Sequence, residues 1–176
     1  MIFFWGVLFL SGVGRAKVFL TLQEALTHAF SAEQKCKTQT ETFYLTAAQK
    51  QRAQNLSGLD VESGLVVRYT ATCDGKKAGH AYTDTHRVRT HPETLFIAVD
   101  SSGAVLKVEV LTFDEPLDYI PRGEWYGAFE TLLLNPDLQL KRKIPFVTGA
   151  SLTAAATVQA TRRILALDQV LGNLKP

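Results

Sequence analysis

The residues whose types and spacing best suit chemistry form a six-residue stretch just before the last helical pattern of the chain. It reads Thr148-Gly149-Ala150-Ser151-Leu152-Thr153, with three hydroxyl residues around a Gly-Ala pair. The free N–H groups and the positive dipole end of a helix start suit a bound anion, most often a phosphate. Ser and Thr are also common N-caps, so this pattern alone leaves a structural cap and an anion site open.

A second group of candidate residues is His80, His86 and His91, which fall within twelve residues and are interleaved with Arg87 and Arg89. A metal site needs converging ligands with an ordered second shell, and the sequence places no carboxylate to supply one. We therefore assign no metal ligands. Residues 85 to 91 instead predict a basic loop or edge strand that attracts an anionic ligand or an acidic redox partner.

Three clustered carboxylates, Asp114, Glu115 and Asp118, are expected to shape a turn before Tyr119. General acid–base catalysis needs a cleft and tuned pKa values, which the sequence does not display. The sequence also contains no Gly-x-Ser-x-Gly elbow and no phosphate loop with a lysine. No catalytic residue is assigned, and the sequence gives little support for independent catalysis.

The elements that must position these residues follow from hydrophobic periodicity and turn signals. Helices are predicted over residues 20–30, 47–56, 151–171 and from about 123 to the Asn135-Pro136 break. Strands are predicted near residues 38–45, 65–72, 79–82, 94–100 and 104–113. This order predicts an α+β fold, an antiparallel sheet with flanking helices, and the length of 176 residues suits one domain.

Composition and the N-terminal segment limit the classes to which the protein can belong. Apolar residues make up 46% of the chain and the formal net charge is +2, so the protein is globular and lacks the basic stripe of a nucleic-acid binder. Residues 1–16 are apolar or small almost throughout, too short for a membrane span of about 18 residues. Gly14 and Ala16 suit a cleavage site. We predict a signal peptide or short apolar anchor over 1–16, and a domain over 17–176.

The two cysteines, Cys36 and Cys73, leave two interpretations open. An exported protein could join them in a disulfide, but the sequence does not supply the geometry that pairing requires. Free thiols are equally consistent with the sequence. Neither cysteine has neighbours at the spacing of a zinc site.

The stretch Thr148–Thr153 resembles the Ser/Thr-Gly-Ala-Thr/Ser-x-Thr motif of the FMN-binding domain family, which includes extracytoplasmic flavoprotein subunits of the Rnf complex and of the sodium-pumping NADH:quinone reductase. Gly79-His80-Ala81-Tyr82, after an Asp-Gly turn, looks like the Gly-x-Ala strand of that family. The hairpin of Phe96 to Phe113 and the segment with Glu115, Tyr119 and 125–129 are also similar. The similarity covers most of residues 20–170, and only the final motif is specific.

In that family a flavin transferase joins the FMN phosphate to the hydroxyl at the fourth motif position. The resemblance implies Ser151 as the attachment point, with Thr148, Gly149, Ala150, Leu152 and Thr153 around the phosphate and the adjoining ring edge. It also implies a periplasmic or otherwise extracytoplasmic electron-transfer module. Its partners would be a flavin transferase and a membrane-bound redox complex.

Two features depart from the family pattern and define the alternatives. Ser151 stands where threonine is usual, and the basic and apolar run 141–147 stands where an acidic residue usually precedes the motif. Non-covalent FMN is one alternative, and an exported binding or scaffold protein of the same fold without flavin is the other. Tyr119, Trp125 and Tyr126 are candidates to stack on a flavin ring or, equally, to be core residues.

Overall fold

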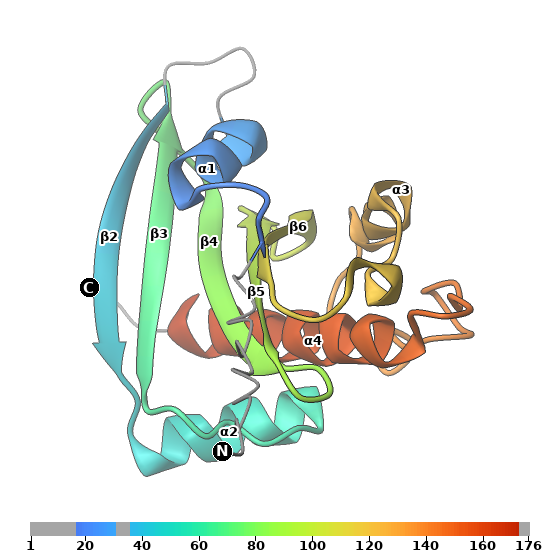
Figure 1. Cartoon of the computed structure of the whole chain (residues 1–176). Coiled ribbons are helices and arrows are strands. Elements are labelled where there is room, and N and C mark those ends of the chain that lie inside the picture. Colours follow the sequence, from blue (N-terminus) through green and yellow to red (C-terminus); the bar gives the residue numbers. More distant parts are fainter. Residues whose placement is uncertain (1–16, 31–35, 173–176) are drawn as a thin grey trace, which may run out of the picture.

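A six-stranded antiparallel sheet with helices on both faces forms the described part of the protein (Figure 1). The structure is a computed structural model, and it describes residues 17–30 and 36–172. It confirms the predicted α+β class with an antiparallel sheet and flanking helices. The predicted signal peptide or anchor over 1–16 lies outside the described residues. Within the described ranges, no helix is long and apolar enough to cross a membrane.

The sheet has the strand order β1-β6-β5-β4-β3-β2. Its strands are β1 (Lys17–Val18), β2 (Cys36–Tyr44), β3 (Leu65–Cys73), β4 (Lys76–Arg87), β5 (Pro92–Asp100) and β6 (Val105–Phe113). The α-helices are α1 (Leu22–Phe30), α2 (Ala47–Ser57), α3 (Gly123–Tyr126) and α4 (Ser151–Gly172). Two short 3₁₀ helices, η1 (Leu117–Tyr119) and η2 (Gly127–Phe129), flank α3.

Local capping residues fix the starts of the first two helices where the sequence predicts them. Thr46 and Gln49 form a capping box at the start of α2, and Gly58 closes this helix in the left-handed conformation. Thr21 and Glu24 exchange the same pair of hydrogen bonds at the start of α1. These bonds satisfy N–H groups that a helix start leaves free. The helices predicted over 20–30 and 47–56 are therefore confirmed.

The alternation of side chains along β5 divides the core between the two faces of the sheet. Leu95, Ile97 and Val99 point to the face that α4 covers, where the larger hydrophobic cluster lies. Phe96 and Ala98 point to the opposite face and pack in a smaller cluster with α1. Figure 1 shows α4 running across the sheet, with α1 on the other side. The long helix that begins within the Thr148–Thr153 motif is thus anchored by buried residues from Thr153 to Leu171.

Gly79 marks the closest approach of β4 to β5. A Cβ atom at this position would lie 2.1 Å from the carbonyl oxygen of Val99, a contact that side chains do not make. The obstacle is backbone in the middle of the sheet and cannot turn aside. Glycine is therefore required here for steric reasons, at the position that resembles the glycine of the Gly-x-Ala strand.

The helix predicted from 123 to Asn135-Pro136 is wrong beyond its first turn. α3 ends at Tyr126, and the chain passes through η2 into an extended segment at Glu130 and a left-handed residue at Thr131 (φ 64°). The reason is long-range: the N–H of Thr131 donates to Val105, and the N–H of Val105 donates to Leu132. The edge of β6 competes for these backbone groups and ends the helix.

Candidate functional site

The Thr148–Thr153 motif lies where the chain enters α4, as predicted, but its hydroxyl groups do not cap the helix. The N–H of Ala154 donates to the carbonyl of Ala150 at 2.9 Å, so Ala150 is the N-cap residue. Alanine has no side-chain acceptor and is among the poorest N-caps. Gly149 precedes it with φ 86°, a left-handed conformation that favours glycine. The structural-cap interpretation of the motif is therefore wrong.

The hydroxyl groups of the motif divide between the interior and the surface. Thr153 is buried and donates its hydroxyl hydrogen bond to the carbonyl of Tyr119, which ties α4 to η1. Thr148 and Ser151 are exposed, as is Leu152. Within residues 17–30 and 36–172, the Ser151 hydroxyl has no hydrogen-bond partner, and no side chain accepts from the N–H groups of residues 151–153. The first turn of α4 therefore presents a hydroxyl and free donors to an external ligand.

A surface hollow of about 490 Å³ adjoins the motif. We call it the motif hollow. One side is formed by Val147, Thr148 and Ala150 and the other by residues around Ile120, Arg122 and Trp125. The guanidinium of Arg122 suits an anion, although the carboxylates of residues 118 and 124 also line the hollow. The position of these walls is fixed because the Trp125 ring nitrogen donates to the carbonyl of Pro145 at 2.8 Å.

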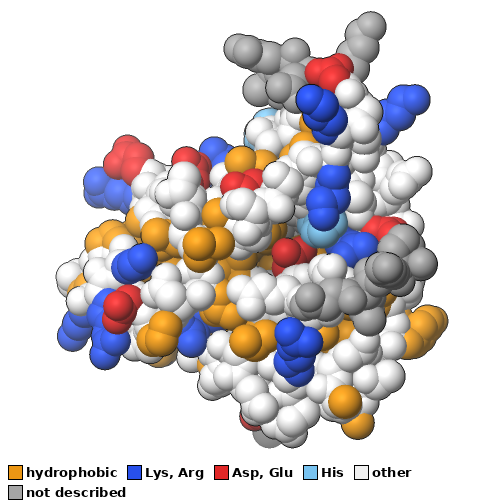
Figure 2. Space-filling view, turned by 180° about the vertical axis from the view of Figure 1, so that it is seen from behind, with side chains coloured by type: hydrophobic (Ala, Val, Ile, Leu, Met, Phe, Trp, Pro, Cys, Tyr) orange, Lys and Arg blue, Asp and Glu red, His pale blue; other side chains and the backbone are white. Residues whose placement is uncertain are grey.

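A larger hollow of about 910 Å³ lies beyond it, and we call it the β6 hollow. Residues 107–110 of β6 form part of its lining together with apolar side chains of Leu117, Pro121 and Tyr126. It shares residues 118, 120, 122 and 124 with the motif hollow, two of them carboxylates. Hydrophobic side chains gather on the side of the molecule that carries α3 (Figure 2). This volume and lining suit a drug-sized or cofactor-sized ligand.

The aromatic residues beside these hollows are mainly core residues. Trp125 packs edge-on against Tyr126 and Phe129, with ring centroids 5.2 Å apart in both pairs. Tyr119 is only half-buried, and the guanidinium of Arg89 lies 4.9 Å from its ring centroid. Of the three aromatic candidates, Tyr119 has the most accessible ring.

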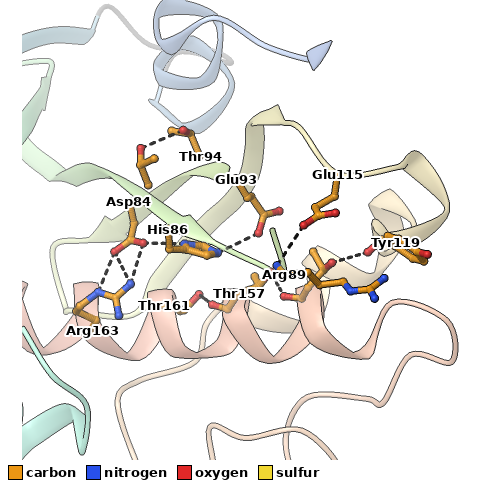
Figure 3. A network of polar contacts seen from close by, with 12 residues as sticks. Asp84, His86, Arg89, Glu93, Thr94, Glu115, Tyr119, Thr157, Thr161 and Arg163 are labelled. Atoms are coloured by element: carbon orange, nitrogen blue, oxygen red, sulfur yellow. Dashed lines mark hydrogen bonds and ion pairs between the residues drawn. The ribbon is translucent and has the colours of Figure 1, made fainter. Parts of the chain in front are cut away.

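The basic loop predicted over residues 85–91 differs from the structure at His86. This residue ends the buried face of β4, and both ring nitrogens are engaged (Figure 3). Nδ1 lies 2.9 Å from Asp84 and Nε2 lies 3.1 Å from Glu93 on β5. Arg163 of α4 completes the group with a two-pronged contact to Asp84 at 2.8 to 3.0 Å. We call these four residues the His86 cluster.

Charge pairing sets the ionisation of the His86 cluster. Burial lowers the pKa of His86, but its hydrogen bonds and ion pairs with Asp84 and Glu93 outweigh burial and raise the pKa to about 9. Burial raises the pKa of Glu93, which is fully buried. Burial also opposes ionisation of Asp84, yet His86 and Arg163 lower the pKa of this carboxyl. The pairing therefore favours the charged form of His86, a mostly buried side chain whose two ring nitrogens both face carboxylates.

Glu115, which the sequence places in a turn before Tyr119, binds the backbone of the loop after β4. Its Oε1 accepts hydrogen bonds from the backbone N–H groups of Arg89, Thr90 and His91, at 3.2, 2.6 and 2.9 Å. These backbone donors, with burial opposing them, lower the pKa of Glu115 to about 2. The backbone N–H groups of the loop after β4 thus bind an anion, and that anion is the Glu115 carboxylate of the same chain.

A second buried histidine cluster lies farther along β4. His80 Nδ1 and the Tyr82 hydroxyl both contact Oδ1 of Asp168 on α4, at 2.6 and 2.7 Å. We call these three residues the His80 cluster. Sequence reasoning missed both clusters. The available signal was the alternation of His80, Tyr82, Asp84 and His86, which places four polar side chains on one strand face.

The two cysteines form a disulfide, which resolves the two interpretations left open by the sequence. Cys36 of β2 and Cys73 of β3 are register partners in the antiparallel pair, with Cα atoms 4.0 Å apart. In the described part of the chain, no group of three or more His, Cys, Asp and Glu side chains is arranged to hold a metal ion.

No protein-family model, curated protein or solved structure matches this chain.

Proposed function

We propose that the protein is an exported flavoprotein that binds FMN through a phosphoester on Ser151 and exchanges electrons with a membrane-bound redox partner. The observation that carries the proposal is the start of α4. Ser151 is exposed there, and the N-cap residue Ala150 leaves the N–H groups of the first turn without a side-chain acceptor. A phosphate ester is the kind of group that such a helix start stabilises.

The surrounding residues fit a flavin mononucleotide. Ser151 would supply the ester oxygen, and the first-turn N–H groups would hold the remaining phosphate oxygens. Gly149 leaves the approach to Ser151 open, because no heavy atom lies within 4 Å of a Cβ built on it. The motif hollow and the β6 hollow offer adjoining space lined by apolar side chains and the cations Lys107 and Arg122, with carboxylates of residues 109, 118, 124 and 130 at their walls. A bound flavin would accept and release electrons together with protons.

The compartment proposed for this activity is extracytoplasmic. The Cys36–Cys73 disulfide supports it, because such bonds form and persist in oxidising compartments. The apolar run over residues 1–16 suits export or a short anchor. A flavin transferase and a membrane-bound redox complex are the partners that this proposal requires.

A second candidate function is a scaffold or binding protein of the same fold without flavin. One observation favours it: Lys141 to Lys143, just before the motif, are exposed. A transferase that reads an acidic residue there would meet a basic surface instead.

The test is co-expression with a flavin transferase in an exporting host, followed by denaturation and a search for flavin fluorescence that stays on the chain. We expect Ser151→Ala to lose the covalent flavin and Ser151→Thr to keep it. Thr148→Ala is the matched control, because Thr148 is another exposed hydroxyl of the motif. Flavin that washes away on denaturation would exclude the phosphoester, and absence of flavin would favour the scaffold. Retention by Ser151→Ala would move the acceptor elsewhere.

A further inference from the structure

The outer edge of β6 is paired at both ends and unpaired between them. At one end β1 pairs with residues 112–113, and the N–H of Phe19 donates to the carbonyl of Leu111. At the other end Val105 exchanges backbone hydrogen bonds with residues 131–132. In the described residues, no strand or loop pairs with the outward backbone groups between Val105 and Leu111. We call this stretch of β6 the open edge.

The β6 hollow lies along the open edge. Residues 107–110 all line it, although consecutive side chains of a strand point alternately to the two faces of a sheet. A hollow that meets four consecutive residues of a strand runs along its edge, where the backbone itself can be reached. The hollow has a volume of about 910 Å³. A partner strand of about five residues matches the length of the open edge.

The outer edge of β2 lacks such surroundings. β2 pairs only with β3, over the nine residues Cys36–Tyr44, and most of its side chains are exposed. None of its residues lines the β6 hollow or the motif hollow. Any unpaired edge offers hydrogen bonds to an extended chain, but specificity requires walls that contact the side chains of that chain. Of these two edges, the open edge of β6 has such walls.

The lining of the β6 hollow indicates the chemistry of its occupant. Four carboxylates face two cations there, namely Glu109, Asp118, Glu124 and Glu130 against Lys107 and Arg122. The whole chain carries a net charge of +2, so this acidic lining is a local feature. Asp118 and Glu124 are exposed and have no ion pair among the described residues. Leu117, with 46% exposure, and Ile120 supply apolar walls.

We propose that the open edge of β6 binds an extended segment of a partner protein as an added strand, in which apolar residues alternate with lysine or arginine. The backbone of the segment exchanges hydrogen bonds with β6. Its basic side chains face Asp118 and Glu124, and its apolar side chains contact Leu117 and Ile120. This inference goes beyond the proposed function and needs no flavin, because Ser151 does not line the β6 hollow.

The first experiment uses flavin-free Ser151→Ala protein and a fluorescent six-residue peptide in which valine alternates with lysine. Fluorescence anisotropy measures its dissociation constant. We expect about tenfold weaker binding when glutamate replaces lysine, and also when backbone N-methylation removes the N–H donors. Absence of binding by the lysine peptide would overturn the proposal and leave the covalent-flavin test unaffected. Equal affinity of the N-methylated peptide would exclude strand pairing, and equal affinity of the glutamate peptide would exclude the basic occupant.

The second experiment locates the bound peptide by amide hydrogen exchange of the same protein. We expect exchange to slow at residues 107–110 when the lysine peptide is present, because their outward N–H groups gain acceptors. The strand Cys36–Tyr44 is the matched control, since it is also a sheet edge, and its exchange should not change. Slowing confined to β2, or equal slowing at both edges, would contradict the proposed site.

The third experiment changes the walls of the hollow. Gly127 lines it, and a Cβ built there has no heavy atom within 4 Å, so Gly127→Trp should fill the hollow and abolish peptide binding. Gly172→Trp, at the end of α4, is its control. Glu124→Lys should weaken the lysine peptide severalfold and tighten the glutamate peptide, whereas Glu62→Lys, at another exposed carboxylate, should change neither. Unchanged binding in Gly127→Trp or Glu124→Lys, with the unfolding midpoint preserved, would overturn the proposal.

Discussion

The two buried histidine clusters lie on the same face of the same strand and differ in how they satisfy their polar atoms. In the His80 cluster, one carboxylate oxygen of Asp168 accepts from both His80 and Tyr82. In the His86 cluster, two carboxylates face one imidazole and one guanidinium. β4 presents both clusters to α4, so their burial has the same structural origin. The comparison isolates the effect of charge at nearly constant burial.

The two clusters differ in how completely their buried polar atoms are hydrogen-bonded. No atom of His80, Tyr82 or Asp168 is among the buried polar atoms without a partner in the described residues. The His86 cluster leaves one oxygen of Glu93 without a hydrogen bond and borders a surface hollow that Asp84, His86 and Arg163 line. Buried ionic groups are expensive to keep compared with apolar packing. A fold that needed only cohesion would be served by the His80 type of arrangement, which leaves fewer charges buried.

The largest expected loss of stability follows removal of the disulfide, and it should weaken the β2–β3 edge of the sheet more than β5. The Cys36–Cys73 disulfide joins β2 and β3, and β3 pairs with β4 at His80. Replacing both cysteines by serine should lower the free energy of unfolding by about 3 to 4 kcal/mol, because the crosslink restricts the unfolded chain. Urea unfolding measures the total loss. Hydrogen exchange should accelerate in β2 and β3 while β5 beside His86 stays protected, and uniform acceleration would contradict this division.

The next comparison removes the charge from one acid of each cluster. Asp84→Asn leaves Arg163 and His86 with an uncharged partner in a buried site, which should cost about 3 kcal/mol of unfolding free energy. Asp168→Asn keeps a carbonyl oxygen for the Tyr82 hydroxyl and should cost about 1 kcal/mol. Urea unfolding of the two variants at the same pH measures both values. Equal losses would mean that charge does not distinguish the clusters.

A smaller effect appears in the pH dependence of stability. The pKa of His86 is about 9 in the folded protein, above its unfolded value of about 6.5. Its stabilisation is therefore fully present below about pH 6.5 and is lost as the pH rises through about 9. After allowance for solvent screening, we expect wild type to lose about 2 kcal/mol across this window. His86→Gln should flatten the loss, whereas His80→Gln should keep it; a steep loss in His86→Gln would refute the assignment.

Much of the fold was predictable from sequence because its determinants are local. The starts of α1 and α2 follow from Thr21 and Thr46, whose capping partners lie three residues away. The β5–β6 hairpin follows from alternating apolar residues around a turn at Asp100. In contrast, the end of α3 depends on backbone bonds between Thr131 and Val105, which no local pattern reveals.

The candidate site also combines features that local sequence predicts with features that depend on distant contacts. The motif and its position at a helix start could be predicted, since hydroxyl residues before an alanine-rich run are a local signal. That Ala150, rather than a hydroxyl residue, is the N-cap depends on where the helix begins. The bond from Thr153 to Tyr119 spans 34 residues. His86 was interpreted as a surface residue because its burial depends on α4, which lies far along the chain.

The smallest expected effect concerns an exposed histidine–carboxylate pair on the opposite side of the sheet. His28 of α1 lies 3.2 Å from Glu109 of β6, but its side chain is 50% exposed. Exposed ion pairs are screened by water and salt and typically contribute below 1 kcal/mol. We expect His28→Ala to change the free energy of unfolding by at most about 0.5 kcal/mol, less than either Asp84→Asn or Asp168→Asn. If His28→Ala matched Asp84→Asn in urea unfolding, burial would not be what gives the His86 cluster its strength, and pairing alone would explain all three sites.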